Sequence, residues 1–217
     1  KSLNRLKQLG FNPKTVFDVG AYEGEFADTC LDIWPHSNIY CFEVLEEKVK
    51  LLKEKFKNKN VVIQEGIVGD ENKEEVKYFS DETASSVLFS EETDTRKKIL
   101  NKKMFTLESL ILKNSILPDL LKIDTQGFEY PILKGMGNYL NSVEVILLEL
   151  NYLDIYFDVK LAHEVIAYLS GLDFVMYDIC EIHRRPLDDA LVQADYIFVK
   201  RNSIYRANKK WSANTIK

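Results

Sequence analysis

The segment VFDVGAYEG, at positions 16–24, sets the strongest limit on how this chain can fold. An apolar run contains Asp18, and Gly20 and Gly24 follow it with three residues between them. This pattern predicts the first strand of an α/β sheet, then a glycine turn, then a helix. Free backbone N–H groups and the positive dipole end of such a helix attract an anionic group, and glycine lets a ligand lie against the main chain. The segment is therefore predicted to hold a cofactor.

Tyr22 helps to identify the cofactor that this segment is predicted to hold. A dinucleotide fingerprint requires glycine at the second turn position, so that a pyrophosphate can approach the backbone, and Tyr22 occupies that position here. S-adenosylmethionine (SAM), an adenosine cofactor without phosphates, suits the spacing better. The next predicted strand, 37–44, contains Glu43 about twenty residues after the turn, where an acidic residue accepts ribose hydroxyls. Glu43 and its neighbour Val44 are thus predicted cofactor contacts.

Composition limits the class of protein and of partner. The 217 residues are 46% hydrophobic, which is enough to build the core of a single α/β domain. The net charge of -5 argues against nucleic acid and favours a small-molecule or glycan acceptor. Three cysteines without disulfide or zinc spacing indicate a reducing, cytoplasmic setting. No apolar run is long enough for a transmembrane segment, the first residues have no signal-peptide pattern, and the oligomeric state stays open.

The chain divides into a helical cap at 1–10, a main domain at 11–201 and a polar tail at 202–217. Within the main domain, a third strand at 61–63 runs into a turn-rich segment. We expect Glu65, Gly66 and Ile67 of that segment to lie near the adenine. A long polar loop at 81–95 follows, and its Ser85 and Ser86 are predicted to contact the acceptor.

The second informative motif is LLKIDTQG, at 120–127, which predicts a buried parallel strand ending in Asp124. Ligands of open α/β sheets bind at the carboxyl ends of the strands, so Asp124 is expected in the site. Glu129 lies in the first turn of the next predicted helix. Glu149 ends the apolar strand at 143–149, and Tyr152 follows it as part of a predicted acceptor wall.

Taken together, five motifs resemble those of the FkbM-family methyltransferases. They are DVGAYEG at 18–24, FEV at 42–44, KIDTQGFE at 122–129, ILKG at 132–135 and LLELNY at 147–152. The resemblance covers about 11–200 and implies a Rossmann-like, doubly wound class I methyltransferase fold. Its seven-stranded sheet would have the order 3-2-1-4-5-7-6 with the last strand antiparallel. It also implies SAM-dependent methyl transfer to a hydroxyl, often on a sugar or polyketide. Tyr22, Thr125 and Gln126 depart from the residues usual in the family.

Methyl transfer to an alcohol requires that the hydroxyl proton be removed, by a general base or with the help of a metal. The catalytic candidates are Asp124, Glu129 and Glu149, with His183 as a weaker alternative. Asp124 with Glu129 or Glu149 could hold a divalent metal, but no motif indicates one and no residue is assigned as a ligand. Cofactor contacts are predicted at Asp18, Gly20, Tyr22, Gly24, Glu43, Val44, Glu65, Gly66, Ile67 and Asp124.

The sequence therefore predicts a SAM-dependent O-methyltransferase acting on a sugar, glycan or related natural product. Two alternatives stay open. One is an NAD-dependent oxidoreductase, against which Tyr22 argues. The other is a module that binds the cofactor without transferring a methyl group.

Overall fold

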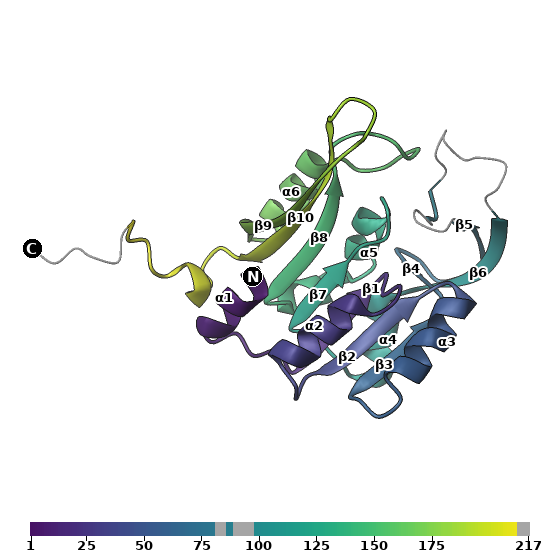
Figure 1. Ribbon diagram of the computed structural model, residues 1–217, viewed down its shortest axis with the longest axis horizontal. Helices are drawn as coiled ribbons and strands as arrows, with labels where there is room; N and C mark the ends of the chain where they lie inside the picture. The colour runs from purple at the N-terminus through teal and green to yellow at the C-terminus, as the bar shows by residue number, and fades with distance from the viewer. Residues whose placement is uncertain (81–85, 89–97, 212–217) are drawn as a thin grey trace, which may run out of the picture.

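The computed structural model describes residues 1–80, 86–88 and 98–211. Ser85, one of the predicted acceptor contacts, lies outside them. A central twisted sheet is covered by helices on both faces (Figure 1). Its strands are β1 (Thr15–Val19), β2 (Asn38–Glu43), β3 (Val61–Glu65), β7 (Leu120–Ile123), β8 (Val145–Asn151), β9 (Phe174–Arg184) and β10 (Leu191–Lys200).

The sheet has the order β3-β2-β1-β7-β8-β10-β9. Numbered along the chain within this sheet, that order is 3-2-1-4-5-7-6, so the predicted fold class is confirmed. The first five of these strands pair in parallel, whereas β10 runs antiparallel to both β8 and β9. The beginning of β10 consequently lies beside the end of β8, at the edge where α/β sheets bind ligands.

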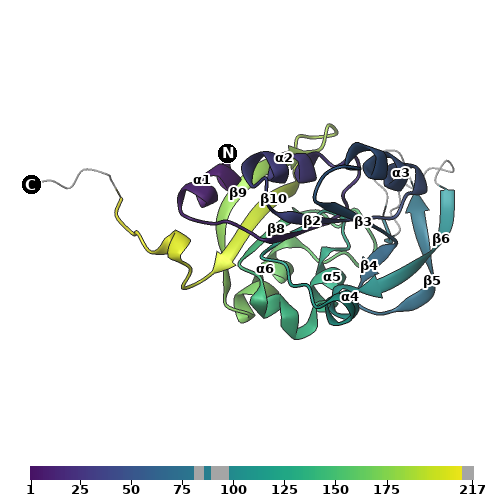
Figure 2. The ribbon, with the colours of Figure 1, turned by 90° about the horizontal axis from the view of Figure 1, so that it is seen from below.

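Helices form one layer on each side of the sheet (Figure 2). The first layer contains α1 (Ser2–Gln8), α2 (Glu25–Ile33) and α3 (Glu46–Lys55), and the second contains α4 (Leu107–Asn114), α5 (Glu129–Lys134) and α6 (Ala162–Gly171). Two apolar clusters fill the spaces between the sheet and these layers. Strands buried on both faces are apolar along nearly their whole length, as Leu120–Ile123 and Val145–Leu148 are. No helix in the described part of the chain is long and apolar enough to cross a membrane.

A second sheet extends the fold beyond the sequence prediction. It has the order β4-β6-β5 and is formed by β4 (Ile67–Gly69), β5 (Lys73–Ser80) and β6 (Lys98–Thr106). The segment around Ile67 was expected to be a turn, but three of its residues pair in parallel with the end of β6. Gly66, with a φ of +129°, separates β3 from β4. The chain thus changes sheets beside the predicted adenine contacts.

The two ends of the described chain pack against the main domain. Arg5 of α1 forms an ion pair with Asp178 of β9 at 2.6 Å. In the polar tail, a short 3-10 helix (Ile204–Arg206) places Tyr205 edge-on to Phe11, with ring centroids 5.6 Å apart. The Tyr205 hydroxyl also donates a hydrogen bond to Glu144 at 2.8 Å.

Candidate active site

A cavity of about 320 Å³ opens at the carboxyl ends of β1, β2 and β7. It is lined by seven residues that the sequence predicted for the cofactor: Gly20, Tyr22, Glu43, Val44, Gly66, Ile67 and Asp124. It is also lined by Val19, Phe42, Leu45, Val68, Tyr78, Val87, Thr125, Gln126 and Phe128. This lining, all from the described residues, contains no lysine or arginine, so the cavity offers no side-chain cation to a phosphate.

The glycine turn after β1 is tightly packed against the turn after β7. Gly20 has a φ of +78°, and a Cβ placed on it would lie 1.8 Å from the Asp124 carbonyl oxygen. Gly24 also has a positive φ, but a Cβ there would meet Phe56 at 2.6 Å. Gly20 is therefore required at the cavity wall, whereas Gly24 allows α2 and α3 to approach each other. The Tyr22 ring lies beneath the ammonium of Lys48, 3.9 Å from its centroid.

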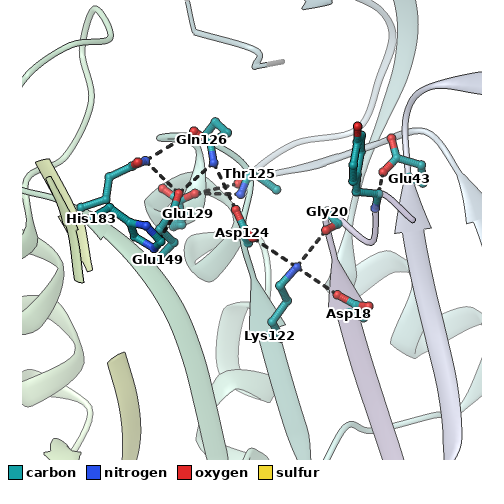
Figure 3. A network of polar contacts seen from close by, with 12 residues as sticks. Asp18, Gly20, Glu43, Lys122, Asp124, Thr125, Gln126, Glu129, Glu149 and His183 are labelled. Carbon is teal, nitrogen blue, oxygen red and sulfur yellow. Dashed lines mark hydrogen bonds and ion pairs between the residues drawn. The ribbon is translucent and has the colours of Figure 1, made fainter. Parts of the chain in front are cut away.

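Glu43 is held rigidly at the end of β2 (Figure 3). Its Oε1 accepts hydrogen bonds from the backbone N–H groups of Val44 and Leu45 at 2.7 and 2.9 Å. Its Oε2 accepts one from the N–H of Tyr22 at 2.8 Å. A carboxylate offers about four acceptor positions, so this oriented group at the cavity wall can accept a further hydrogen bond from a ligand hydroxyl.

Asp18 lies behind the cavity and does not line it, because its side chain is fully buried between the sheet and α2. Its partner is Lys122 of β7, which stands opposite it in the strand register. The Lys122 ammonium is 3.2 Å from Asp18 Oδ1 and 3.5 Å from Asp124 Oδ2, and it donates to the Gly20 carbonyl at 2.8 Å. Burial by itself lowers the pKa of Lys122, but the two carboxylates outweigh it and hold that pKa above its ordinary value. Lys122 therefore stays charged and ties the ends of β1 and β7 together.

Glu129 supports the loop that follows Asp124. Its Oε1 accepts hydrogen bonds from the N–H of Thr125 at 2.9 Å, the Thr125 hydroxyl at 3.1 Å and the N–H of Gly127 at 3.2 Å. The loop between Asp124 and Glu129 has positive φ values of +55° at Gln126 and +100° at Gly127. Burial raises the pKa of Glu129 to about 7, although the donated hydrogen bonds oppose that shift. Glu129 is thus placed to fix the loop rather than to face the cavity.

A polar cluster extends from Asp124 to the neighbouring strands β8 and β10 (Figure 3). It consists of Asp124, Gln126, Glu149 and Gln193. The Gln126 amide donates to Asp124 at 3.3 Å and to Glu149 Oε2 at 2.9 Å, and Gln193 of β10 donates to the same Glu149 oxygen at 2.8 Å. Burial, with the negative charges of Asp124, Glu129 and Asp195, raises the pKa of Glu149 to about 9. Gln126 links this cluster to the cavity, because it also belongs to the cavity wall.

The sequence matches the family described as Methyltransferase FkbM domain over residues 18–176. The chain belongs to this family. The predicted family is therefore confirmed, and no curated protein matches the sequence.

Solved methyltransferases share the fold of this FkbM-family protein. The magnesium protoporphyrin IX methyltransferase of Synechocystis PCC 6803, which holds bound SAM, is 10% identical with a TM-score of 0.52, over 92% of this chain and 76% of that one. Aeropyrum pernix fibrillarin, with natively bound SAM, is 13% identical with a TM-score of 0.50, over 90% and 74%. The precorrin-6y C5,15-methyltransferase of Geobacter metallireducens GS-15 is 13% identical with a TM-score of 0.50, over 90% and 85%. Family and fold together support SAM as the cofactor, as predicted.

The remaining predicted site residues of the FkbM-family protein lie around the cavity rather than in its lining. Glu65 is exposed and forms an ion pair with Lys102 at 3.0 Å. Ser86 is buried, and its hydroxyl donates to the Gln126 carbonyl at 2.8 Å. The hydroxyl of Tyr152 contacts that of Tyr196.

Five polar residues around the cavity and the neighbouring polar cluster were not predicted as site residues: Lys122, Thr125, Gln126, Gln193 and Asp195. The sequence does mark Gln193 and Asp195 as unusual, because these two polar residues alternate with apolar ones at the beginning of β10. Only the strand order shows that this end lies beside Glu149.

Replacing Glu129 with glutamine is expected to weaken the pH dependence of stability. The folded protein raises the pKa of this carboxyl to about 7 from its ordinary value of 4.5, so the carboxyl binds its proton more tightly than it does in the unfolded chain. The free energy of unfolding therefore falls between those two pH values, by up to about 3 kcal/mol from this group. Urea unfolding at about pH 5 and about pH 7.5 should show a smaller difference for Glu129→Gln than for wild type. Equal differences would show that Glu129 does not titrate in this way.

Proposed function

We propose that this FkbM-family protein transfers a methyl group from SAM to a hydroxyl of a sugar, glycan or related natural product. The observation that carries the proposal is the continuity between the cavity and the polar cluster. Asp124 and Gln126 belong to both, so a molecule in the cavity has carboxylates and amides beside it. Such groups recognise hydroxyls, because they accept and donate hydrogen bonds in fixed directions.

The cavity suits SAM in its shape and its polar groups. Glu43 offers an oriented carboxylate for the ribose, and the turn at Gly20 presents main chain without a side chain in the way. Phe42, Ile67 and other apolar residues supply the flat, apolar surroundings that an adenine ring needs. The absence of lysine and arginine from the described lining disfavours the pyrophosphate of NAD.

When bound, SAM supplies an electrophilic methyl group, so the residues of the chain must align the acceptor oxygen and take up its proton. Within the polar cluster, Asp124 is the carboxylate that lines the cavity, with 39% of its side chain exposed, and we assign it the contact with the reacting hydroxyl. Lys122 and Gln126 orient Asp124 from either side. Glu149 supports Gln126 on the side away from the cavity, and Glu129 acts as a positioning residue for the loop.

Removal of the Glu43 carboxylate is expected to weaken cofactor binding. Glu43→Gln should lower the affinity for S-adenosylhomocysteine about 10- to 100-fold, because it removes a charge-assisted hydrogen bond from the cavity. Isothermal titration calorimetry measures this directly. The matched control is Glu65→Gln, on the neighbouring strand and opposite Glu43 in the register, with an exposed side chain. Equal affinities for the Glu43 variant and wild type would remove Glu43 from the site.

The acceptor class can be tested by labelled methyl transfer. Purified protein is incubated with deuterated-methyl SAM and a panel of mono- and oligosaccharides and polyketide alcohols, and tandem mass spectrometry locates the label. The proposal predicts an O-linked methyl group on at least one acceptor, and its loss in Asp124→Asn. Labelling at nitrogen or carbon only would contradict transfer to a hydroxyl. Cofactor binding without transfer to any acceptor would favour the binding-module alternative.

A further inference from the structure

Three side chains with metal-binding chemistry meet at the edge of the sheet that carries the polar cluster. They are Glu149 of β8, His183 of β9 and Asp195 of β10, and their ligand atoms all lie within 4.8 Å of one another. Figure 3 shows His183 and Glu149 side by side. Neither pairs closely with the other, since His183 Nε2 is 3.9 Å from Glu149 Oε1. That separation is too long for a hydrogen bond.

The strand register explains why these residues meet. Asp195 stands opposite Glu149 across the antiparallel β8–β10 pair, and Gln193, two residues before Asp195, stands opposite His183. Residues two apart in a strand point to the same face of the sheet. One nitrogen and two carboxylate ligands are therefore presented by three adjacent strands of the sheet and not by a flexible loop.

Glu149 is oriented as metal-binding carboxylates are. Its Oε2 is occupied by the side-chain amides of Gln126 and Gln193, at 2.9 and 2.8 Å. Its Oε1 is the oxygen nearest His183. Metal-binding carboxylates are usually oriented by outer-shell hydrogen bonds of this kind. The bonds hold one oxygen in place and leave the other oxygen directed at the metal ion. Metal–ligand distances are about 2.0 to 2.2 Å, so two ligands of one ion stand up to about 4.4 Å apart. The 3.9 Å between His183 Nε2 and Glu149 Oε1 fits such a pair.

Asn151 of β8 is a buried polar side chain on the same face of the sheet as these three residues. Its side chain is 1% exposed, and within the described residues neither its amide nitrogen nor its oxygen has a hydrogen-bond partner. It lies two residues after Glu149 in β8, hence on the same face, and it stands opposite Gln193 in the register. A buried amide without a partner is costly, so this position calls for a ligand or a bound water.

We propose that Glu149, His183 and Asp195 bind a divalent transition-metal ion, with Asn151 beside it as a further oxygen donor. A set of one imidazole and carboxylate or amide oxygens suits ions such as Mn²⁺ and Fe²⁺. Because Gln126 connects Glu149 to the cavity wall, the ion would lie next to the acceptor and orient it. Ion binding stands without the proposed function, whereas this role in orienting the acceptor rests on it.

The test is a titration of the full chain with Mn²⁺ alone, followed by electron paramagnetic resonance of the free ion. Wild type is expected to bind one Mn²⁺ saturably, and His183→Ala and Asp195→Asn to bind it at least 10-fold more weakly. His163→Ala, an exposed histidine of α6, is the matched control and should bind like wild type. Absence of saturable binding in wild type, or equal affinity in His183→Ala, would overturn the proposal.

S-adenosylhomocysteine affinity is measured on the same samples by calorimetry. All three variants are expected to retain it within about twofold, because none of the substituted residues lines the cavity. This readout also shows that each variant is folded. Mn²⁺ binding without methyl transfer to a hydroxyl would refute the proposed function and leave the metal site intact. Methyl transfer to a hydroxyl by a protein that does not bind Mn²⁺ would refute the metal site and leave the proposed function intact.

Discussion

Lys122→Met is expected to lower the free energy of unfolding by about 3 to 5 kcal/mol, the usual cost of removing one partner of a buried ion pair. The substitution leaves the fully buried Asp18 without its cation and the Gly20 carbonyl without its 2.8 Å donor. Urea unfolding followed by circular dichroism measures the change. The control is Lys113→Met at an exposed position of α4, where we expect a change within about 0.5 kcal/mol.

A double-mutant cycle separates the interaction between Asp18 and Lys122 from the other effects of each substitution on stability. Asp18→Asn combined with Lys122→Met removes both charges, so the double variant should be more stable than the sum of the two single changes predicts. Strict additivity would show that the two groups do not interact. A Lys122→Met protein as stable as wild type would contradict the assignment of Lys122 as the charge that joins β1 and β7.

Gly20→Ala is expected to abolish measurable cofactor binding and to destabilise the protein. The new Cβ would lie 1.8 Å from the Asp124 carbonyl oxygen, so the turns after β1 and β7 must separate. The left-handed φ of +78° adds strain of about 1 to 3 kcal/mol for a residue with a side chain. Calorimetry with S-adenosylhomocysteine and thermal unfolding report the two effects.

Gly171→Ala, at the end of α6, is the matched control for this substitution. A Cβ there meets nothing within 4 Å, and alanine favours a helix, so stability should stay the same or rise by up to about 1 kcal/mol. Gly20→Ala protein that binds S-adenosylhomocysteine as wild type does would show that the close approach of the two turns is not needed for the cavity.

The main sheet could be predicted because its determinants are local or belong to recognisable motifs. The apolar runs around Phe17 and Leu121 mark buried strands, and the glycines after β1 mark a tight turn. The second sheet could not be predicted in the same way. Its β4 has only three residues, and β6 contains three lysines and alternates weakly, so the pairing of these strands depends on where Gly66 turns the chain.

The candidate site was predictable in part for a related reason. Glu43 ends β2 and Asp124 directly follows β7, which are local properties of the sequence, and the structure places both residues at the cavity. The partner of Asp18 was not predictable, because Lys122 is more than one hundred residues away and becomes its neighbour only through strand order. His183 and Asp195 meet Glu149 for the same reason. Residue types can be inferred from a motif, whereas their pairing requires the topology.

We expect SAM to occupy the cavity with its ribose against Glu43 and its reactive end toward Asp124. A crystal structure of the protein with bound S-adenosylhomocysteine is the decisive experiment. The ribose hydroxyls should lie within hydrogen-bond distance of the Glu43 carboxylate, and the sulfur should face Asp124 and Gln126. Density for the ligand outside the cavity, or in the reverse orientation with its sulfur away from Asp124, would contradict it.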